Sequence, residues 1–166
     1  MDKPMTSREV ELAVAKWIDT REHLAVPNVS WGLGLHECDI LYLSERGYAS
    51  EVEIKVSKSD FRADAHKRHA HRSPRIKYLW FAFPLTLAEL QYEVPEHAGV
   101  LLAYRRDYML GCKVAKEARA NTSAQAFTQA EILKMARLGT LRIWVLKRRL
   151  LELEGKCYDG DCDYQI

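Results

Sequence analysis

Two alternating segments separated by a short turn constrain the fold of this chain most strongly. Over most of their length, residues 37–43 and 48–56 alternate between polar and apolar side chains, as strands with one buried face do. The turn sequence Ser44-Glu-Arg-Gly47 lies between them. A three-residue loop with Gly47 in the left-handed conformation sets Ser44 opposite Tyr48. We therefore expect a β-hairpin whose pairing follows from that register.

This register gathers charge on one face of the hairpin. It sets Asp39 opposite Glu53 and Glu37 opposite Lys55, with Glu51 on the same face. Directly opposed side chains have Cβ atoms about 5 Å apart, so two carboxylates can hold one cation between them. The opposite face is apolar and contains the expected pairs Cys38–Ile54 and Ile40–Val52.

The excess of carboxylates over lysine on this face has two explanations. A solvated face with cross-strand ion pairs is common on protein surfaces. Alternatively, a divalent cation relieves the repulsion among the acids, and hard oxygen ligands suit Mg²⁺ or Mn²⁺. The residues alone leave both explanations open.

The rest of the chain predicts a single mixed α/β domain with a mixed β-sheet. Residues 75–83 are strongly apolar and predict a central strand. Its aromatic residues Trp80, Phe81 and Phe83 are expected in the core, and Trp144 is also expected to pack. The further expected elements are a helix from Thr6 or Ser7 to about Asp19, a strand over 24–31, a helix from Ser57 to about Arg72, a short helix over 85–92, a hairpin of 99–104 and 108–114, a helix over 128–138 closed by Gly139, and residues 140–154 as a helix or as a strand followed by a helix.

Composition sets wider limits. The 166 residues are 48% hydrophobic and 29% charged, as expected for one globular domain over residues 1–155. Residues 156–166 form an acidic tail that contains Cys157 and Cys162, expected to be free thiols, with a disulfide or a metal site as alternatives. No segment is apolar and long enough for a membrane helix or a signal peptide, so a cytoplasmic location is expected. A net charge of +2 is too small to establish a nucleic-acid partner.

The hairpin also carries a family resemblance. Asp39, followed on the next strand by Glu53-Ile-Lys55, resembles the PD-(D/E)XK nuclease signature, although Cys38 stands where the motif has proline. The order of elements over residues 7–83 resembles the αβββαβ restriction-endonuclease-like core of that superfamily. The stretch from Glu51 to Asp64 is similar to MmcB-like DNA repair proteins and to phage nuclease-like proteins.

The resemblance implies a metal-dependent nuclease that hydrolyses phosphodiester bonds of DNA. It implies that Asp39 and Glu53 ligate Mg²⁺ or Mn²⁺ together with the Ile54 carbonyl. Lys55 would orient or deprotonate the attacking water and stabilise charge on the phosphate, and the carboxylates beside it favour its charged form and hence the electrostatic role.

Four further acids are candidates for the metal site. Glu37 and Glu51 could bind a second ion. Some superfamily members also use a glutamate of the first helix, and here Glu9 and Glu11 are both candidates, between which the helical pattern does not choose.

The DNA partner would be contacted by basic residues that follow the active face. Lys58, Arg62, Lys67 and Arg68 are the candidates for phosphate contacts. A homodimer would place one site on each strand of a duplex. The alternatives are a non-catalytic DNA-binding module with the same fold and a scaffold protein whose acidic face is only solvated.

Overall fold

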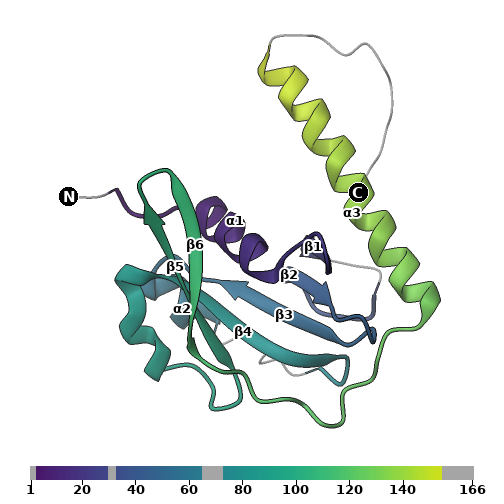
Figure 1. Ribbon diagram of the computed structural model, residues 1–166, viewed down its shortest axis with the longest axis horizontal. Coiled ribbons are helices and arrows are strands. Elements are labelled where there is room, and N and C mark those ends of the chain that lie inside the picture. The colour runs from purple at the N-terminus through teal and green to yellow at the C-terminus, as the bar shows by residue number, and fades with distance from the viewer. Residues whose placement is uncertain (1–2, 30–32, 65–72, 155–166) are drawn as a thin grey trace.

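The chain forms one six-stranded mixed sheet with helices against both faces (Figure 1). The computed structural model describes residues 3–29, 33–64 and 73–154. The elements are α1 (Ser7–Ile18), β1 (Leu24–Val29), β2 (Cys38–Leu43), β3 (Ala49–Ile54), α2 (Lys58–Asp64), β4 (Ile76–Pro84), the 3₁₀ helix η1 (Leu85–Tyr92), β5 (Gly99–Arg106), β6 (Met109–Lys116) and α3 (Gln129–Leu153).

The strands lie in sequence order, from β1 at one edge to β6 at the other. Neighbouring strands are antiparallel except that β3 pairs parallel to β4, and β4 parallel to β5. The carboxyl ends of β3, β4 and β5 therefore lie side by side, at the end of the sheet toward which all three strands run. The expected order of helix, three strands, helix and strand is confirmed, and so is the central position of β4.

The hairpin register agrees with the expectation. Ile40 pairs with Val52 and Leu43 with Ala49. The Ser44 N–H donates to the Tyr48 carbonyl at 3.0 Å, and Gly47 has a φ of 75°. A glycine is needed there because other residues rarely adopt that left-handed conformation.

The expected place of Cys38 on the apolar face with Ile40 and Ile54 is wrong. Cys38 packs in a different cluster, with Leu41 and other residues of the opposite face. The physical reason lies in β1, where Asn28 follows Pro27 and has a positive φ of 53°. Asn28 lies between the β1 partners of Ile40 and Cys38, so the left-handed turn breaks the alternation at this point.

Apolar clusters cover both faces of the sheet. The α1 side chains Val10, Ala13, Val14 and Ile18 pack on one face, against residues that include Ile40, Val52 and Trp80. On the other face, Phe61 of α2 and Leu90 of η1 pack against Phe81 and Phe83. Trp80, Phe81 and Phe83 are buried, which confirms their expected core positions.

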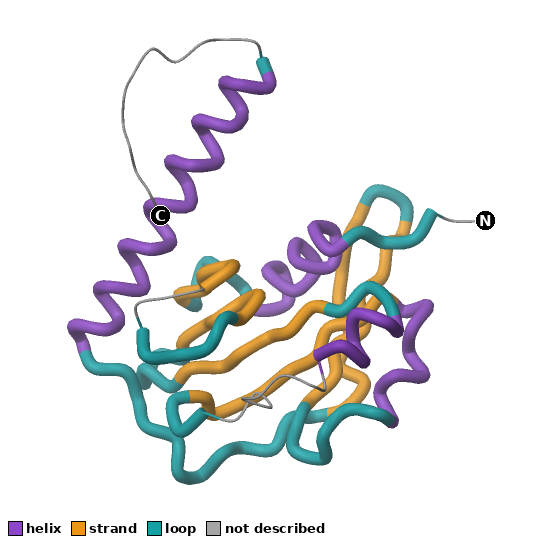
Figure 2. The backbone as a smooth tube through the Cα atoms, turned by 180° about the vertical axis from the view of Figure 1, so that it is seen from behind, coloured by secondary structure: helices purple, strands orange, loops and turns teal. Residues whose placement is uncertain are grey.

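Helix α3 confirms the helical alternative for residues 140–153 but differs from the expectation in two other ways. It runs without interruption from Gln129 to Leu153, so Gly139 does not close a helix. A glycine inside a helix costs only about 1 kcal/mol, and at this position the missing side chain allows close approach to Val26. Trp144, which was expected to pack, is 61% exposed. The tube in Figure 2 shows that the second half of α3 extends away from the sheet.

Several expectations fall outside the described residues. These are the basic helix beyond Asp64 with Lys67 and Arg68, and the tail with Cys157 and Cys162. In the described ranges, Cys38 and Cys112 are free cysteines. Among the described helices, none is both long and apolar enough to span a bilayer.

Candidate functional site

The site lies at the carboxyl end of β3, an inner strand of the sheet. The parallel neighbour β4 holds this end in place, because the Lys55 N–H donates to the Ala82 carbonyl at 3.0 Å. A pocket of about 340 Å³ opens beside it. The pocket is lined by Ser7, Glu37, Cys38, Asp39, Glu53, Ile54, Lys55 and Asp60.

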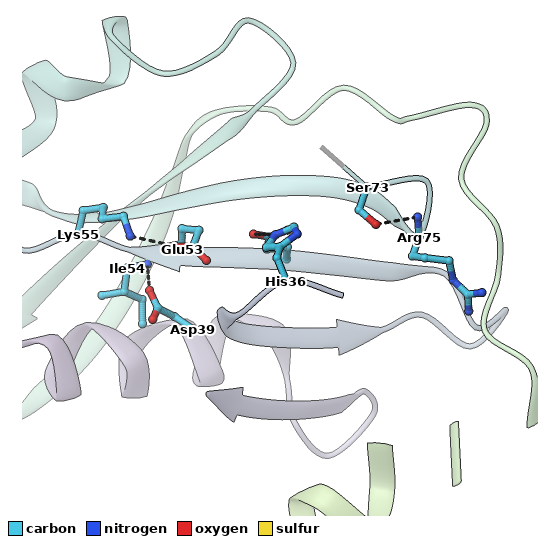
Figure 3. Close-up of polar contacts among 8 residues, drawn as sticks. His36, Asp39, Glu53, Ile54, Lys55, Ser73 and Arg75 are labelled. Atoms are coloured by element: carbon cyan, nitrogen blue, oxygen red, sulfur yellow. Dashed lines mark hydrogen bonds and ion pairs between the residues drawn. The ribbon is translucent and has the colours of Figure 1, made fainter. Parts of the chain in front are cut away.

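Asp39 is fixed to β3 through its side chain. The described ladder between β2 and β3 ends at Ile40–Val52, one position before Asp39. There the Asp39 Oδ2 atom accepts a hydrogen bond of 2.7 Å from the Ile54 N–H (Figure 3). A carboxylate oxygen thus takes the place of a strand carbonyl, and Asp39 is held beside the strand that carries the other site residues.

Glu53 and Lys55 form a buried ion pair. Glu53 belongs to β3 and Lys55 directly follows the last residue of that strand, so the two lie two positions apart and share a face. The Lys55 Nζ atom lies 2.8 Å from Glu53 Oε2. Lys55 is 4% exposed and Glu53 is 2% exposed. Burying such charges costs several kcal/mol per ion before their attraction is counted, so the pair is weak evidence for stability.

The ionisation of Glu53 reflects this burial. Burial raises the pKa of Glu53 to about 7, against the lowering effect of the Lys55 ammonium, and the nearby Asp39 raises it further. Asp39 and Glu53 line the same pocket, and Asp39 Oδ2 is bonded to the N–H of Ile54, the residue after Glu53, in agreement with the hairpin register. Added positive charge between them would stabilise both ionised forms.

Glu51 occupies a separate position deeper in the sheet. It is fully buried, and its Oε1 atom lies 2.8 Å from His36 Nε2 (Figure 3). It does not line the pocket. Of the two acids expected to serve a second ion, the structure therefore brings Glu37 to the pocket and pairs Glu51 with His36.

The two glutamates of α1 have different surroundings. Glu9 completes a capping box with Thr6 and forms an ion pair with Arg105. These contacts lower the pKa of Glu9. Glu11 is half-buried, and its pKa is raised by burial and then by Asp39. Glu9 is therefore engaged by Thr6 and Arg105, whereas the carboxyl of Glu11 is influenced by Asp39 without lining the pocket.

The expected DNA-contacting residues Lys58 and Arg62 lie on α2, beyond the pocket. Their side chains are 53% and 66% exposed. Lys58 forms an ion pair with Glu89 at 2.9 Å, and Arg62 lies 3.9 Å from Glu93. Glu89 belongs to η1 and Glu93 follows its last residue, so the two basic side chains bridge α2 and the η1 segment at the surface.

Three residues near the site were not among the sequence candidates. Ser7 and Asp60 line the pocket from the first turns of α1 and α2, and His36 holds Glu51. Asp60 carries a signal in the sequence, because it follows the capping residue Ser57, whose Oγ accepts the Asp60 N–H at 3.1 Å. The cap at Ser57 starts α2 shortly after β3 ends, so the first turn of the helix lies beside the end of the strand.

The donor set of the pocket fits a hard divalent cation. Its candidate ligands are carboxylate oxygens and a backbone carbonyl, and Mg²⁺ is usually bound through one or two carboxylates while it keeps several waters. Within residues 3–29, 33–64 and 73–154, no group of three or more His, Cys, Asp or Glu side chains could hold a metal ion. Two carboxylates, Asp39 and Glu53, therefore match the requirement of Mg²⁺ better than that of a fully protein-ligated ion.

Cys38 is unsuited to act as a nucleophile. Burial raises the pKa of its thiol far above neutral, and the neighbouring acids, Glu51 first among them, raise it further. The thiolate is the nucleophilic form of cysteine, and it is suppressed here. The pocket therefore offers carboxylate oxygens and the Lys55 ammonium, and not a thiolate, as its reactive groups.

Comparisons with known proteins identify a family. The family model described as "DNA repair protein MmcB-like" matches residues 2–149. No curated protein sequence matches the chain. Among solved structures, a protein of unknown function from Silicibacter pomeroyi is similar, with 20% identity and a TM-score of 0.61 over 96% of this chain and 99% of that one. At this identity the likeness concerns the fold alone.

Proposed function

The chain belongs to the MmcB-like family of DNA repair proteins, and on that premise we propose that it is a metal-dependent nuclease of the PD-(D/E)XK type. The proposed reaction is the hydrolysis of phosphodiester bonds in DNA. The proposed cofactor is Mg²⁺, with Mn²⁺ as a substitute.

One observation carries this proposal. Asp39, Glu53 and Lys55 come from two neighbouring strands or their ends and line one pocket at the carboxyl end of β3. A solvated acidic face would leave these side chains exposed, whereas Glu53 and Lys55 are almost fully buried. Buried charges are expensive, so their retention in a pocket favours a functional role.

The roles of the residues follow from their contacts. Asp39 and Glu53 would hold the cation, with Asp39 fixed in place by the Ile54 N–H. Lys55 carries its ammonium at the pocket, held at Glu53 Oε2, where it can donate to a phosphate oxygen and orient water. When bound, Mg²⁺ would supply positive charge for the phosphate and would make water more acidic.

The residues next to this core have supporting roles in the proposal. Glu37 lines the pocket, where it would bind waters of the cation's hydration shell. Lys58 and Arg62 would contact the DNA backbone beyond the pocket after exchanging their acidic partners for phosphates. Such contacts position DNA without reading its sequence.

A second candidate function is a DNA-binding module that does not cut. It is favoured by the ion pair in which the Lys55 ammonium occupies Glu53 Oε2, an oxygen that a cation would otherwise use. The same charged pocket would then bind DNA without hydrolysing it. Cleavage assays separate the two functions.

The test is cleavage of supercoiled plasmid, single-stranded DNA and branched DNA by the purified protein with Mg²⁺, with Mn²⁺ or with EDTA. A Glu53→Ala/Lys55→Ala variant is the inactive comparison. Glu96→Gln is a matched control, because Glu96 pairs with Arg119 at the surface before β5, outside the pocket.

Metal-dependent cutting that only the Glu53→Ala/Lys55→Ala variant loses supports the nuclease and ranks its substrates. Intact DNA binding without cutting by any of the proteins supports the binding module. Cutting that survives in the double variant contradicts the assigned site.

A further inference from the structure

The second half of α3 presents an apolar stripe to solvent. After its first turns pack on β1, the helix extends away from the sheet (Figure 1). In the described residues, Arg142 is the last α3 residue with a hydrogen bond to the sheet, donated to the Asn28 carbonyl. Beyond it lie large exposed apolar residues on one side of the helix: Ile143 (54%), Leu146 (58%), Leu150 (57%) and Leu153 (85%).

These four residues, the α3 stripe, have the spacing of a coiled-coil seam. They are separated by three, four and three positions. Apolar residues at that spacing keep one side of a helix against a partner helix. A helix that only faced water would carry polar side chains at these positions.

The stripe continues the side of α3 that is already buried against the sheet. Gly139, which lies against Val26, is seven residues before Leu146, and Leu146 is seven before Leu153. Positions seven apart lie on nearly the same side of a helix. One continuous apolar side therefore covers β1 in its first half and has no cover from the described residues in its second half.

We propose that the α3 stripe is the interface through which two copies of this chain form a dimer. The order of three, four and three positions reads the same in both directions along the helix. An antiparallel pair related by a two-fold axis then sets Ile143 against Leu153 of the second copy, and Leu146 against its Leu150. Such a self-complementary patch is what a two-fold interface requires.

Apolar contact, and not charge pairing, carries this arrangement. In the antiparallel register, Lys147 of each helix is level with Arg149 of the second copy, so no ion pair forms there. Lys147 lies over the Trp144 ring of its own helix, 5.2 Å from the ring centroid. Arg148 lies on the opposite side of the helix and pairs with Glu152 of its own chain at 3.8 Å.

The size of the surface is adequate for association of two copies. Four large apolar side chains that are more than half exposed amount to a patch on the order of a few hundred Å², which a monomer rarely leaves uncovered. Doubled across a two-fold axis, with the flanking residues included, the buried area reaches on the order of 1,000 Å², the lower range of specific interfaces.

The test is the mass of the full chain in solution by light scattering and sedimentation over a range of concentrations. The compared proteins are wild type, Leu146→Glu/Leu150→Glu and the control Arg148→Glu. The two variants change the formal charge equally, so only the position of the change differs. Circular dichroism checks that each variant keeps its helix content.

We expect the wild-type protein and Arg148→Glu to be dimers of the 19.2 kDa chain. Leu146→Glu/Leu150→Glu should self-associate about 100-fold more weakly or worse, because charge enters the seam twice. A monomeric wild type at every concentration would overturn the proposal. So would dimerisation of Leu146→Glu/Leu150→Glu that is as strong as that of wild type.

Discussion

The carboxylate of Asp39 accepts the backbone N–H of Ile54 at 2.7 Å, at the point where the described β2–β3 ladder has ended. This bond joins the two strands that carry the candidate catalytic residues. It fixes one candidate metal-ligating side chain to the backbone between the other two site residues, Glu53 and Lys55. The hydrogen bond that joins β2 and β3 at the end opposite the turn therefore also positions the site.

Substitution of Asp39 should separate its structural role from its chemical role. Asp39→Asn keeps an oxygen acceptor for the Ile54 N–H, so stability should change little while metal binding and cleavage are lost. Asp39→Ala removes the acceptor as well and should lower the free energy of unfolding by about 1–3 kcal/mol. Urea denaturation and Mg²⁺ titration calorimetry measure the two effects. Equal stability of the two variants would contradict the structural role.

The buried pair of Glu53 and Lys55 predicts strong coupling between the two substitutions. Lys55→Met removes the cation beside a buried carboxylate and should cost about 3 kcal/mol of folding stability. Glu53→Gln in the same chain removes the buried negative charge, so the double variant should be more stable than Lys55→Met alone. A double-mutant cycle of unfolding free energies measures the coupling. Additive effects would mean that the pair contributes nothing as a unit.

Metal affinity should depend on pH because burial raises the pKa of Glu53 to about 7. Below this value the carboxyl is mainly protonated and cannot ligate a cation, and above it the carboxylate is available. Mg²⁺ binding should therefore weaken by up to about tenfold for each unit that the pH falls below about 7. Calorimetry at about pH 8 and about pH 6 tests this, and Asp39→Asn is the control for the site. An affinity that does not change over this interval would show that Glu53 is not a ligand.

The surface pairs of α2 predict how DNA binding depends on salt. Lys58→Ala and Arg62→Ala should each weaken binding to any DNA sequence and lower the salt slope by about one phosphate contact. Glu89→Gln should have the opposite effect, because Lys58 loses its competing partner on η1. Fluorescence anisotropy at several salt concentrations measures all three slopes. Unchanged slopes for both basic substitutions would place the DNA elsewhere on the protein.

Features that depend on local alternation and turn chemistry could be predicted from the sequence. The hairpin register followed from Gly47 and the turn length, and this register alone predicted that Asp39 lies near Glu53. The apolar segment that forms β4 was predicted as central because its aromatic residues leave neither face polar.

Other features depended on contacts between distant segments and could not be predicted locally. The reversal of Cys38 depends on the left-handed Asn28 of a neighbouring strand. Gly139 looked like a helix end because nothing local shows that Val26 needs its small size. The engagement of Glu9 by Arg105 could not be predicted locally, because Arg105 lies far away in the sequence.

The nuclease assignment is tested most directly by the single-turnover rate of DNA cleavage by wild type, Asp39→Asn and Glu96→Gln at a Mg²⁺ concentration that saturates wild type, measured beside the DNA affinity of each protein. We expect Asp39→Asn to bind DNA as tightly as wild type but to cleave it at least about 100-fold more slowly, because Lewis-acid stabilisation of the phosphate is lost. Glu96→Gln should match wild type in both respects. Cleavage by Asp39→Asn at the wild-type rate would contradict the assignment of the pocket at the end of β3 as a nuclease site.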